Sequence, residues 1–278
     1  MATLAKNNLL LRGLKGITTT SNPIKRETLY RRVVFFSLLF VGWELFSHSG
    51  VWPDYLFPGP IAIAQSLWSG LKKGLYIYGT WVSMLRLIAG YVISLLIGVP
   101  LGALIARNKY FKDTLGALVI SLQALPSVCW LPLAILWFGL NERAILFVVV
   151  MGSLFSIVLG VESGINNTPP IYVKAARNLG TTGLRLYTRV ILPSAFPIIL
   201  AGLKQGWAFA WRSLMSAELL YFTLSLGNLL QTGRDLNDAA QVMAVMTVII
   251  GIGLAFNQLL FAPFERQIAN RWGFSPSK

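Results

Sequence analysis

The chain has 278 residues, of which 55% are hydrophobic and only 12% are charged. An ordinary soluble domain carries about twice that share of charge, so the composition excludes a typical soluble enzyme or binding domain. The formal net charge is +14, but the cations fall between long apolar runs, which indicates membrane orientation rather than nucleic-acid binding. With His48 as the only histidine and Cys129 as the only cysteine, a structural zinc site or a histidine triad is excluded as well.

The N-terminal part of the chain predicts a basic arm followed by a short span. Residues 1–32 are expected to form a cytoplasmic arm, because they contain several basic residues and a single acidic one, Glu27. Residues 33–48 are the first expected span, with Glu44 near its far end. A Pro-rich turn follows. Apolar residues three and four apart over 59–74 then predict an amphipathic helix at the membrane surface.

Five further apolar runs complete a transmembrane domain that we expect over residues 33–262. Their expected limits are 80–106, 115–140, 144–161, 194–221 and 239–261. Pro126 and Pro132 should interrupt the run at 115–140, and a proline inside a span requires protein neighbours or water to satisfy the freed backbone groups. Residues 263–278 are expected to be a cytoplasmic tail. The sequence therefore predicts an all-α, polytopic membrane protein with about six transmembrane helices.

The distribution of cations predicts the orientation of these spans. With the N-terminus inside, 17 Lys and Arg residues fall on the cytoplasmic side and 4 on the other side. Arg86, Lys204 and Arg212 remain within spans. This bias predicts that both termini lie in the cytoplasm.

The cytoplasmic loop over 163–193 is more structured than a connector requires. Asn167 and Thr168 are capping candidates, the two prolines after them suit first helical positions, and Gly180 is a natural helix stop. The apolar face of this first helix comprises Tyr172, Ala175, Ala176 and Leu179, and a polar face holds Lys174, Arg177 and Asn178. A second short helix fits residues 184–192, with Pro193 as its expected end.

The fifth span has one polar side. At about 100° per residue, its polar arc comprises Lys204, Gln205, Ala208, Trp211, Arg212, Met215, Ser216 and Glu218. Charged groups within spans are costly, so Arg86, Lys204, Arg212 and Glu218 are candidates to line a water-filled path, and Met215 is a further candidate because it lies on the polar arc. The alternative is structural pairing, for Arg86 with Glu218 or Glu44. A small excess of cations in the spans would favour an anionic solute.

The loop also resembles a known family. The segment "AARNLGTTGLRLYTRVILP" is similar to the cytoplasmic signature of membrane subunits in binding-protein-dependent ABC importers: Glu-Ala-Ala, three residues, Gly, nine residues, Ile, one residue, Leu-Pro. Five positions match in register, whereas Lys174 replaces the usual Glu and Val190 the usual Ile. The resemblance implies that the loop is a coupling helix that docks on a cytoplasmic ATPase. The implied coupling residues are Lys174, Ala175, Ala176, Leu179, Gly180, Leu192 and Pro193. A basic loop that holds lipid headgroups is the alternative.

Further segments extend the resemblance from about residue 57 onward. "LFPGPIAIAQSLW", "MLRLIAGYVISLLIGVPLGALIA", "LQALPSVCWLPLAILWFG" and "LKQGWAFAWRSLMSAELL" are similar to the nitrate/sulfonate/bicarbonate group. The resemblance implies a type I ABC importer-like permease in the bacterial inner membrane, working as a homodimer. Its implied partners are two cytoplasmic ATP-binding subunits, which would hold ATP and Mg, and an extracytoplasmic solute-binding protein, with membrane lipids around it. The chain has no Gly-rich phosphate loop, so we expect no cofactor in it and no enzymatic activity of its own.

The solute and two rival classes stay open at this point. The segments "WAFAWRSLMSAELL" and "NPIKRE" look most like cyanobacterial nitrate permeases, which makes nitrate and nitrite the first candidates. Bicarbonate, cyanate and an organosulfonate are the alternatives. A secondary transporter would usually show inverted repeats, and no matching pair of interrupted segments is found. A structural anchor for a peripheral ATPase would not need the polar side of the fifth span.

Overall fold

The computed structural model describes residues 26–53 and 55–272, and the described residues form helices and no strands. The chain divides into two units, residues 1–52 and residues 53–278, and each is described by itself. Most of the expected cytoplasmic arm lies outside the described residues. Its last part, however, already belongs to helix α2 (Arg26–Ser47).

Helix α2 is the described helix of the first unit. It covers the first expected span up to Ser47, including Glu44, and it begins earlier, so that it also includes Arg31 and Arg32. Because of these charges, α2 is not among the helices that are long and apolar enough to cross a membrane. The structure therefore differs from the six predicted spans at this point.

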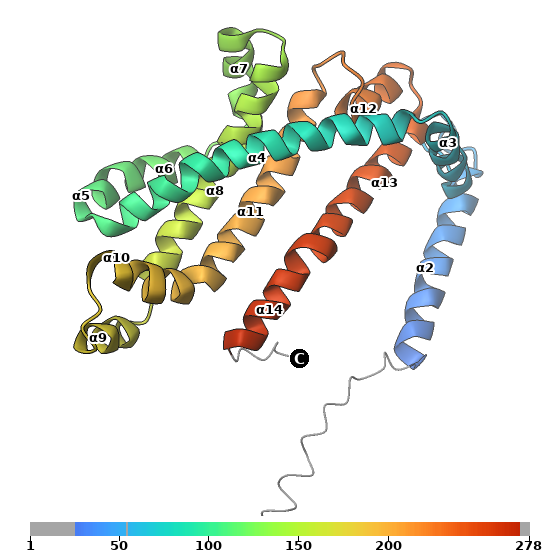
Figure 1. Ribbon diagram of the computed structural model, residues 1–278. Coiled ribbons are helices and arrows are strands. Elements are labelled where there is room, and N and C mark those ends of the chain that lie inside the picture. The colour runs from blue at the N-terminus through green and yellow to red at the C-terminus, as the bar shows by residue number, and fades with distance from the viewer. Residues whose placement is uncertain (1–25, 54, 273–278) are drawn as a thin grey trace, which may run out of the picture. The chain divides into compact units, whose positions relative to one another are not determined.

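The second unit is built from helices joined by short turns (Figure 1). In chain order they are α3 (Pro60–Lys72), α4 (Leu75–Arg107), α5 (Lys109–Phe111), η1 (Lys112–Gly116), α6 (Ala117–Gln123), η2 (Ser127–Cys129), α7 (Trp130–Phe138), α8 (Glu142–Asn166), α9 (Pro170–Asn178), α10 (Gly183–Leu186), η3 (Tyr187–Ile191), α11 (Leu192–Glu218), α12 (Leu226–Asp235), α13 (Ala239–Phe256), η4 (Asn257–Phe261) and α14 (Ala262–Trp272). The segments η1, η3 and η4 are π-helical and η2 is a 3-10 turn.

Four helical segments of this unit are long and apolar enough to span a membrane: Leu75–Arg107, Glu142–Asn166, Gly183–Glu218 and Ala239–Ile268. A fifth apolar segment is the pair Lys109–Gln123 and Ser127–Phe138, whose two parts meet at an angle of 94°. The break at Pro126 agrees with the prediction. Pro132 does not interrupt the helix, because it lies in the first turn of α7, where a missing N–H breaks no intrahelical hydrogen bond.

Pro193 does not end a helix either, contrary to the prediction. It stands near the start of α11, directly after the π-helical turn η3, and the helical segment runs on to Glu218. Proline lacks an N–H and its ring would meet the carbonyl group four residues earlier, at Arg189. The wider π-helical turn over Tyr187–Ile191 accommodates this within one continuous span.

Helix α8 is the centre of the second unit and packs against α4 on one side and α11 on the other. Small residues bring these backbones together. A Cβ on Gly102 of α4 would lie 2.6 Å from the carbonyl oxygen of Val158, and one on Gly160 of α8 would lie 2.5 Å from the Cα of Gly202. Ser153 donates to Ser94 at 2.6 Å across the α4–α8 contact. Close packing and such hydrogen bonds hold membrane helices together, because lipid tails remove the hydrophobic drive for association.

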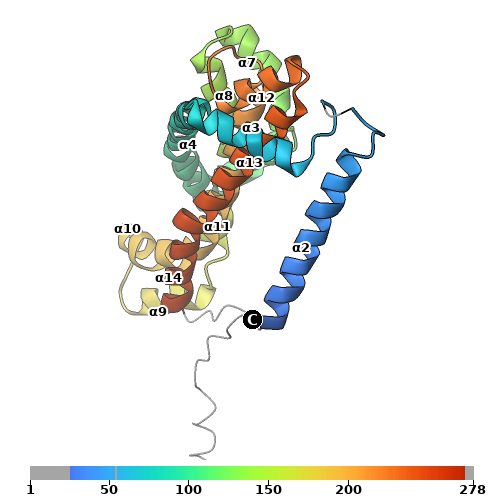
Figure 2. The same cartoon turned by 90° about the vertical axis from the view of Figure 1, so that its right-hand side faces the viewer.

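Several short helices mark the two ends of the second unit. Helices α9 and α10, from the loop over 163–193, lie at one end with α14, whereas α7 and α12 lie at the opposite end in both views (Figure 2). The helical segment from α13 to α14 contacts α11 through stacked rings of Trp207 and Phe256, whose centroids are 4.9 Å apart.

Candidate functional site

Helix α11 has the two-sided character that the sequence predicts. Gln205, Ala208 and Arg212 are exposed on one side, and Gly206, Ala210 and Leu214 are buried on the other. The buried side packs on α8, where small residues allow close approach. The exposed side is therefore free to face water or another subunit.

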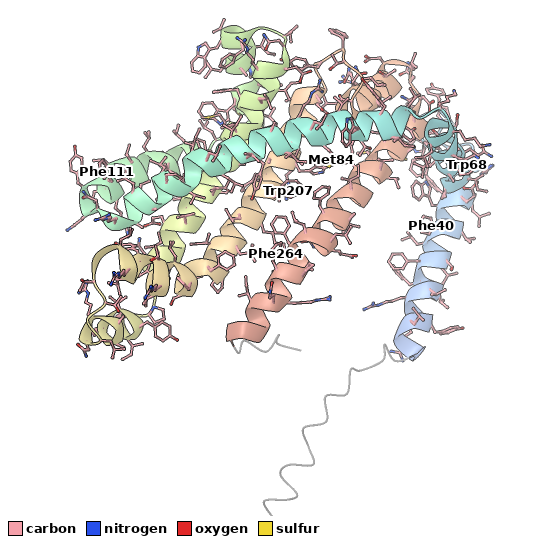
Figure 3. All side chains as sticks on the ribbon, in the orientation of Figure 1. Phe40, Trp68, Met84, Phe111, Trp207 and Phe264 are labelled. Atoms are coloured by element: carbon pink, nitrogen blue, oxygen red, sulfur yellow. The ribbon has the colours of Figure 1, made fainter. Side chains whose placement is uncertain are left out.

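A first cavity, of about 250 Å³, lies between α11 and the α13–η4 segment. It is lined by Lys204, Trp207, Ala208, Trp211, Arg212, Gly253, Asn257 and Phe261, and we call it the aromatic cavity. Trp207 points into the space between α11 and α13 (Figure 3). The aromatic cavity thus combines two cationic side chains with three aromatic rings.

A second cavity, of about 270 Å³, lies at the break between α6 and η2, and we call it the break cavity. The break itself contributes six consecutive residues, 123–128. Met151, Gly152 and Phe155 of α8 complete the wall with Phe209 and Arg212 of α11. Non-helical backbone at membrane depth is tolerated where it is buried in protein or lines water, so a wet cavity suits this position.

Arg212 is the residue that the two cavities share. Its guanidinium carbon lies 5.6 Å from the ring centroid of Phe209, and it forms no ion pair within the described part of the chain. Lys204 differs, because its Nζ lies 2.7 Å from Oε1 of Glu265 on α14. The sequence interpretation treated the two cations alike and missed Glu265, which it placed in the tail.

Arg86 and Glu218 lie in a buried polar network rather than beside either cavity. Glu218 has no exposed surface and its carboxylate lies 3.0 Å from the Arg86 guanidinium. It also accepts from the Ser83 hydroxyl at 2.7 Å and from the Gly227 backbone N–H at 3.2 Å. Of the two roles weighed for Arg86, ion pairing with Glu218 is the arrangement found. Glu218 belongs to this network and not to the exposed side of α11.

The network extends to residues that the sequence interpretation did not single out. Arg86 also donates to both carboxylate oxygens of Glu142 and, at 2.8 Å, to the Thr223 hydroxyl. One guanidinium thereby joins four parts of the chain: α4, the start of α8, the end of α11 and the turn after α11. Nearby, burial raises the pKa of the Tyr221 phenol. Met215 is half-buried and packs against the α4–α8–α11 core, so it makes a weaker path candidate than Arg212.

The loop over 163–193 forms two short helical segments separated by a turn at Gly180. Gly180 has a φ of +79°, the Thr181 N–H donates to the Ala176 carbonyl at 2.9 Å, and the Gly180 N–H donates to the Arg177 carbonyl at 2.9 Å. This is the hydrogen-bond pattern with which a left-handed glycine ends a helix. The prediction that Gly180 stops the first helix is therefore confirmed.

The predicted apolar face of this helix is split between the protein interior and the surface. Ala176 is buried in a core cluster formed with residues of α8, η3 and α11, whereas Tyr172, Ala175 and Leu179 are exposed, Leu179 to 85%. Lys174 is exposed as well, and so are Leu192 and Pro193 at the start of α11. On α9 and directly after it, Ile171, Tyr172 and Leu179 are large apolar side chains left exposed, while the buried Ala176 holds α9 against the rest of the second unit.

Comparison with known proteins places these features in a family. Residues 98–269 match the family described as "Binding-protein-dependent transport system inner membrane component". A protein of Methanocaldococcus jannaschii that is named as an ABC transporter permease is 31% identical over 68% of this chain and 71% of its own length. The aliphatic sulfonates transport permease SsuC of Escherichia coli K12 is 28% identical, covering 83% and 89% of the two chains. The nitrate import permease NrtB of Leptolyngbya laminosa is 26% identical, covering 84% and 86%.

The fold agrees with this assignment. The structure of the MetNI methionine ABC transporter in an inward-facing conformation contains a chain that superposes with a TM-score of 0.62 at 18% sequence identity. The match covers 71% of this chain and 97% of that one. The all-helical architecture is that of type I ABC importer permeases, and the chain is a transport permease rather than an enzyme. The chain belongs to the binding-protein-dependent transport system inner membrane component family.

Proposed function

We propose that the chain is the permease subunit of an ATP-driven importer that carries a small anion into the cell. It works as a homodimer with two cytoplasmic ATP-binding subunits and an extracytoplasmic solute-binding protein. It lies in the bacterial inner membrane with both termini in the cytoplasm, as the positive-inside bias favours. ATP and Mg are bound by the partner subunits.

The position of Arg212 is the observation that carries the proposal for an anion. Its guanidinium lines both the break cavity and the aromatic cavity and has no carboxylate partner among the described residues. A guanidinium offers five N–H donors in a planar fork, which suits oxyanions. Because it is exposed rather than enclosed, binding there stays weak enough to allow release, as conduction requires. Lys204, held by Glu265, contributes less free positive charge.

Nitrate and nitrite are the first candidate solutes. They are small oxyanions, and NrtB, a nitrate import permease, is among the relatives. An aliphatic sulfonate is the second candidate. It is supported by the similarity to SsuC and by the apolar walls that Phe155, Phe209 and Trp211 give the two cavities. Bicarbonate and cyanate share the oxyanion or small-anion character but not the need for apolar walls.

The exposed apolar surface of α9 supports the proposed coupling to an ATPase. Ile171, Tyr172 and Leu179 are exposed at the end of the second unit that also holds α14. An apolar surface on a polar cytoplasmic loop is typical of a contact with another protein.

Reconstituted uptake tests the proposal. The permease and its ATPases are placed in vesicles with ATP inside and binding protein outside, and uptake of labelled nitrate and of an alkanesulfonate is measured. Arg212→Met should lower uptake while basal ATP hydrolysis persists. Arg143→Met, a change to an exposed arginine away from both cavities, is the control. Uptake that follows an ion gradient without ATP would contradict the proposal, and so would full uptake by Arg212→Met.

Thiol labelling locates the path independently of the solute. In a Cys129→Ala background, single cysteines at 205, 208 and 212 should react with a small water-soluble reagent, because these positions are exposed on α11. Cysteines at 206, 210 and 214 should not react, because these positions lie on the buried side of α11, which packs against α8. The opposite pattern would place the solute path elsewhere.

A further inference from the structure

A third cavity, of about 450 Å³, lies away from the proposed path, and we call it the interfacial cavity. It is formed between the last turns of α4 and the segment from α10 to the start of α11. Its lining includes Pro100, Leu104, Arg107, Leu184, Tyr187 and Leu192. Arg107 is the last residue of the α4 span, so the cavity lies where an apolar helix passes into a basic loop.

The walls of the interfacial cavity are apolar and uncovered. Leu104, Leu184 and Leu192 are all exposed, Leu184 to 77%. Such side chains in one hollow favour an apolar occupant, because removing their surface from water is favourable. In a membrane, the acyl chains of the surrounding lipids are the most abundant apolar groups that could occupy it.

The rim of the interfacial cavity is cationic. The Arg107 guanidinium carbon lies 5.7 Å from the ring centroid of Tyr187, which holds the side chain against η3. Arg107 has no carboxylate partner within the described residues. The same is true of Lys109, two residues after Arg107, and of Arg185 and Arg189, on either side of Tyr187. A positioned guanidinium with free N–H donors suits a phosphate group.

We propose that the interfacial cavity binds one anionic phospholipid. Its phosphate contacts Arg107, and the part of an acyl chain next to the headgroup packs on Leu104, Leu184 and Leu192. Cationic hollows between membrane helices on the cytoplasmic side suit anionic headgroups. A soluble phosphate would use the arginine but not the leucines, and a neutral lipid would use the leucines but not the arginine. The combination of both selects an anionic lipid, and it does not depend on which solute the permease carries.

Lipid binding to the full transporter tests this proposal. The complex is delipidated in detergent and titrated with phosphatidylglycerol or with phosphatidylcholine of the same acyl chains, and bound lipids are counted by native mass spectrometry. One surface cation near anionic lipid is worth about 1 kcal/mol, so we expect phosphatidylglycerol to bind about fivefold more tightly than phosphatidylcholine. Equal binding of the two lipids would overturn the proposal.

Variants assign the preference to the cavity. Arg107→Gln should abolish the preference for phosphatidylglycerol, whereas Arg143→Gln, the matched arginine in the turn before α8, should leave it intact. Leu184→Ser should weaken the binding of both lipids. If glycerol phosphate without acyl chains binds as well as the lipid, the site takes a free phosphate group and the proposal is wrong. It is also wrong if Arg107→Gln releases the ATP-binding subunits without changing the lipid preference, because the cavity then serves a protein contact.

Discussion

At the scale of single residues, Arg86, Glu218, Lys204 and Arg212 occupy three different environments. Arg86 and Glu218 are buried together, Lys204 is bound to Glu265 at a half-exposed position, and Arg212 is exposed without a carboxylate. A cation in the membrane is costly and needs a partner or water. Each environment meets that requirement differently, and only the third leaves the positive charge available to a solute.

Breaking the buried network should destabilise the protein strongly. Glu218→Ala leaves Arg86 with Glu142 as its one carboxylate partner, beside the Thr223 hydroxyl, and removes the acceptor of Ser83 and Gly227. Removing one partner of a buried pair typically costs about 3–5 kcal/mol. We expect Glu218→Ala to lower the apparent unfolding temperature in detergent markedly, as followed by tryptophan fluorescence.

Glu265→Ala is the control for this experiment. It breaks the half-exposed pair with Lys204, and exposed pairs contribute about 0–1 kcal/mol. Its unfolding temperature should stay close to that of the unchanged protein. If both variants lowered the unfolding temperature equally, the Arg86 network would stabilise the protein no more than the exposed pair does.

At the scale of helices, small residues decide how α4, α8 and α11 meet. Gly160 and Gly202 face each other where α8 and α11 cross, and a Cβ on either would collide with the other backbone. Backbones cannot move apart there without opening the contacts beside them. The crossing of α8 and α11 is therefore fixed by backbone contact rather than by interlocking large side chains.

Gly160→Ala should disturb this crossing. Forcing extra volume into a well-packed contact typically costs about 1–3 kcal/mol. We expect a lower unfolding temperature and a smaller yield of monodisperse protein on size-exclusion chromatography. Gly251→Ala on α13 is the control, because nothing lies within 4 Å of a Cβ at that position. A tolerated Gly160→Ala would show that the helices separate more easily than their contact suggests.

The exposed surface of α9 allows a sharper test of coupling than its buried face. Ala176 packs inside its own subunit, so a large residue there would damage the permease as well as any docking. Leu179→Asp changes a side chain that is 85% exposed and should leave the fold intact. We expect the assembled complex to lose most solute-stimulated ATP hydrolysis.

Leu236→Asp, at another exposed leucine in the turn after α12, serves as the control for coupling. It should hydrolyse ATP normally, since it lies at the end of the second unit away from α9. Normal solute-stimulated ATP hydrolysis in Leu179→Asp would show that the ATPase does not bind this surface.

At the scale of the whole molecule, the two ends of the second unit differ in charge as the positive-inside rule predicts. The loop with Lys109 and the α9–α10 loop are rich in cations, whereas Arg143 belongs to a short turn at the other end of α8. The helical spans connect these ends.

Labelling from one side of the membrane should reveal this polarity. In a Cys129→Ala background, Lys109→Cys should react with an impermeant thiol reagent only after the membrane is opened, and Arg143→Cys should react in intact cells. The bias of Lys and Arg toward the cytoplasm is the physical basis of this expectation. Labelling of Lys109→Cys in intact cells would reverse the proposed orientation.

The sequence by itself determined the features that depend on local composition. Long apolar runs specified helices, Gly180 specified a helix end through its freedom to adopt a positive φ, and the alternation of residues on α11 specified a buried and an exposed side. The coupling signature identified the class of the protein because its residues lie close together in the chain.

The tertiary structure decided which distant residues meet. Arg86 and Glu218 are 132 positions apart, and Lys204 and Glu265 are 61 apart, so periodicity within one helix could not distinguish them from the unpaired Arg212. The turn before Pro193 is local, but the sequence pattern did not reveal it either, because the chain avoids a break by widening one helical turn. Which charges are neutralised depends on how α4, α8, α11 and α14 pack, and that packing is set by contacts between segments that the sequence alone does not place side by side.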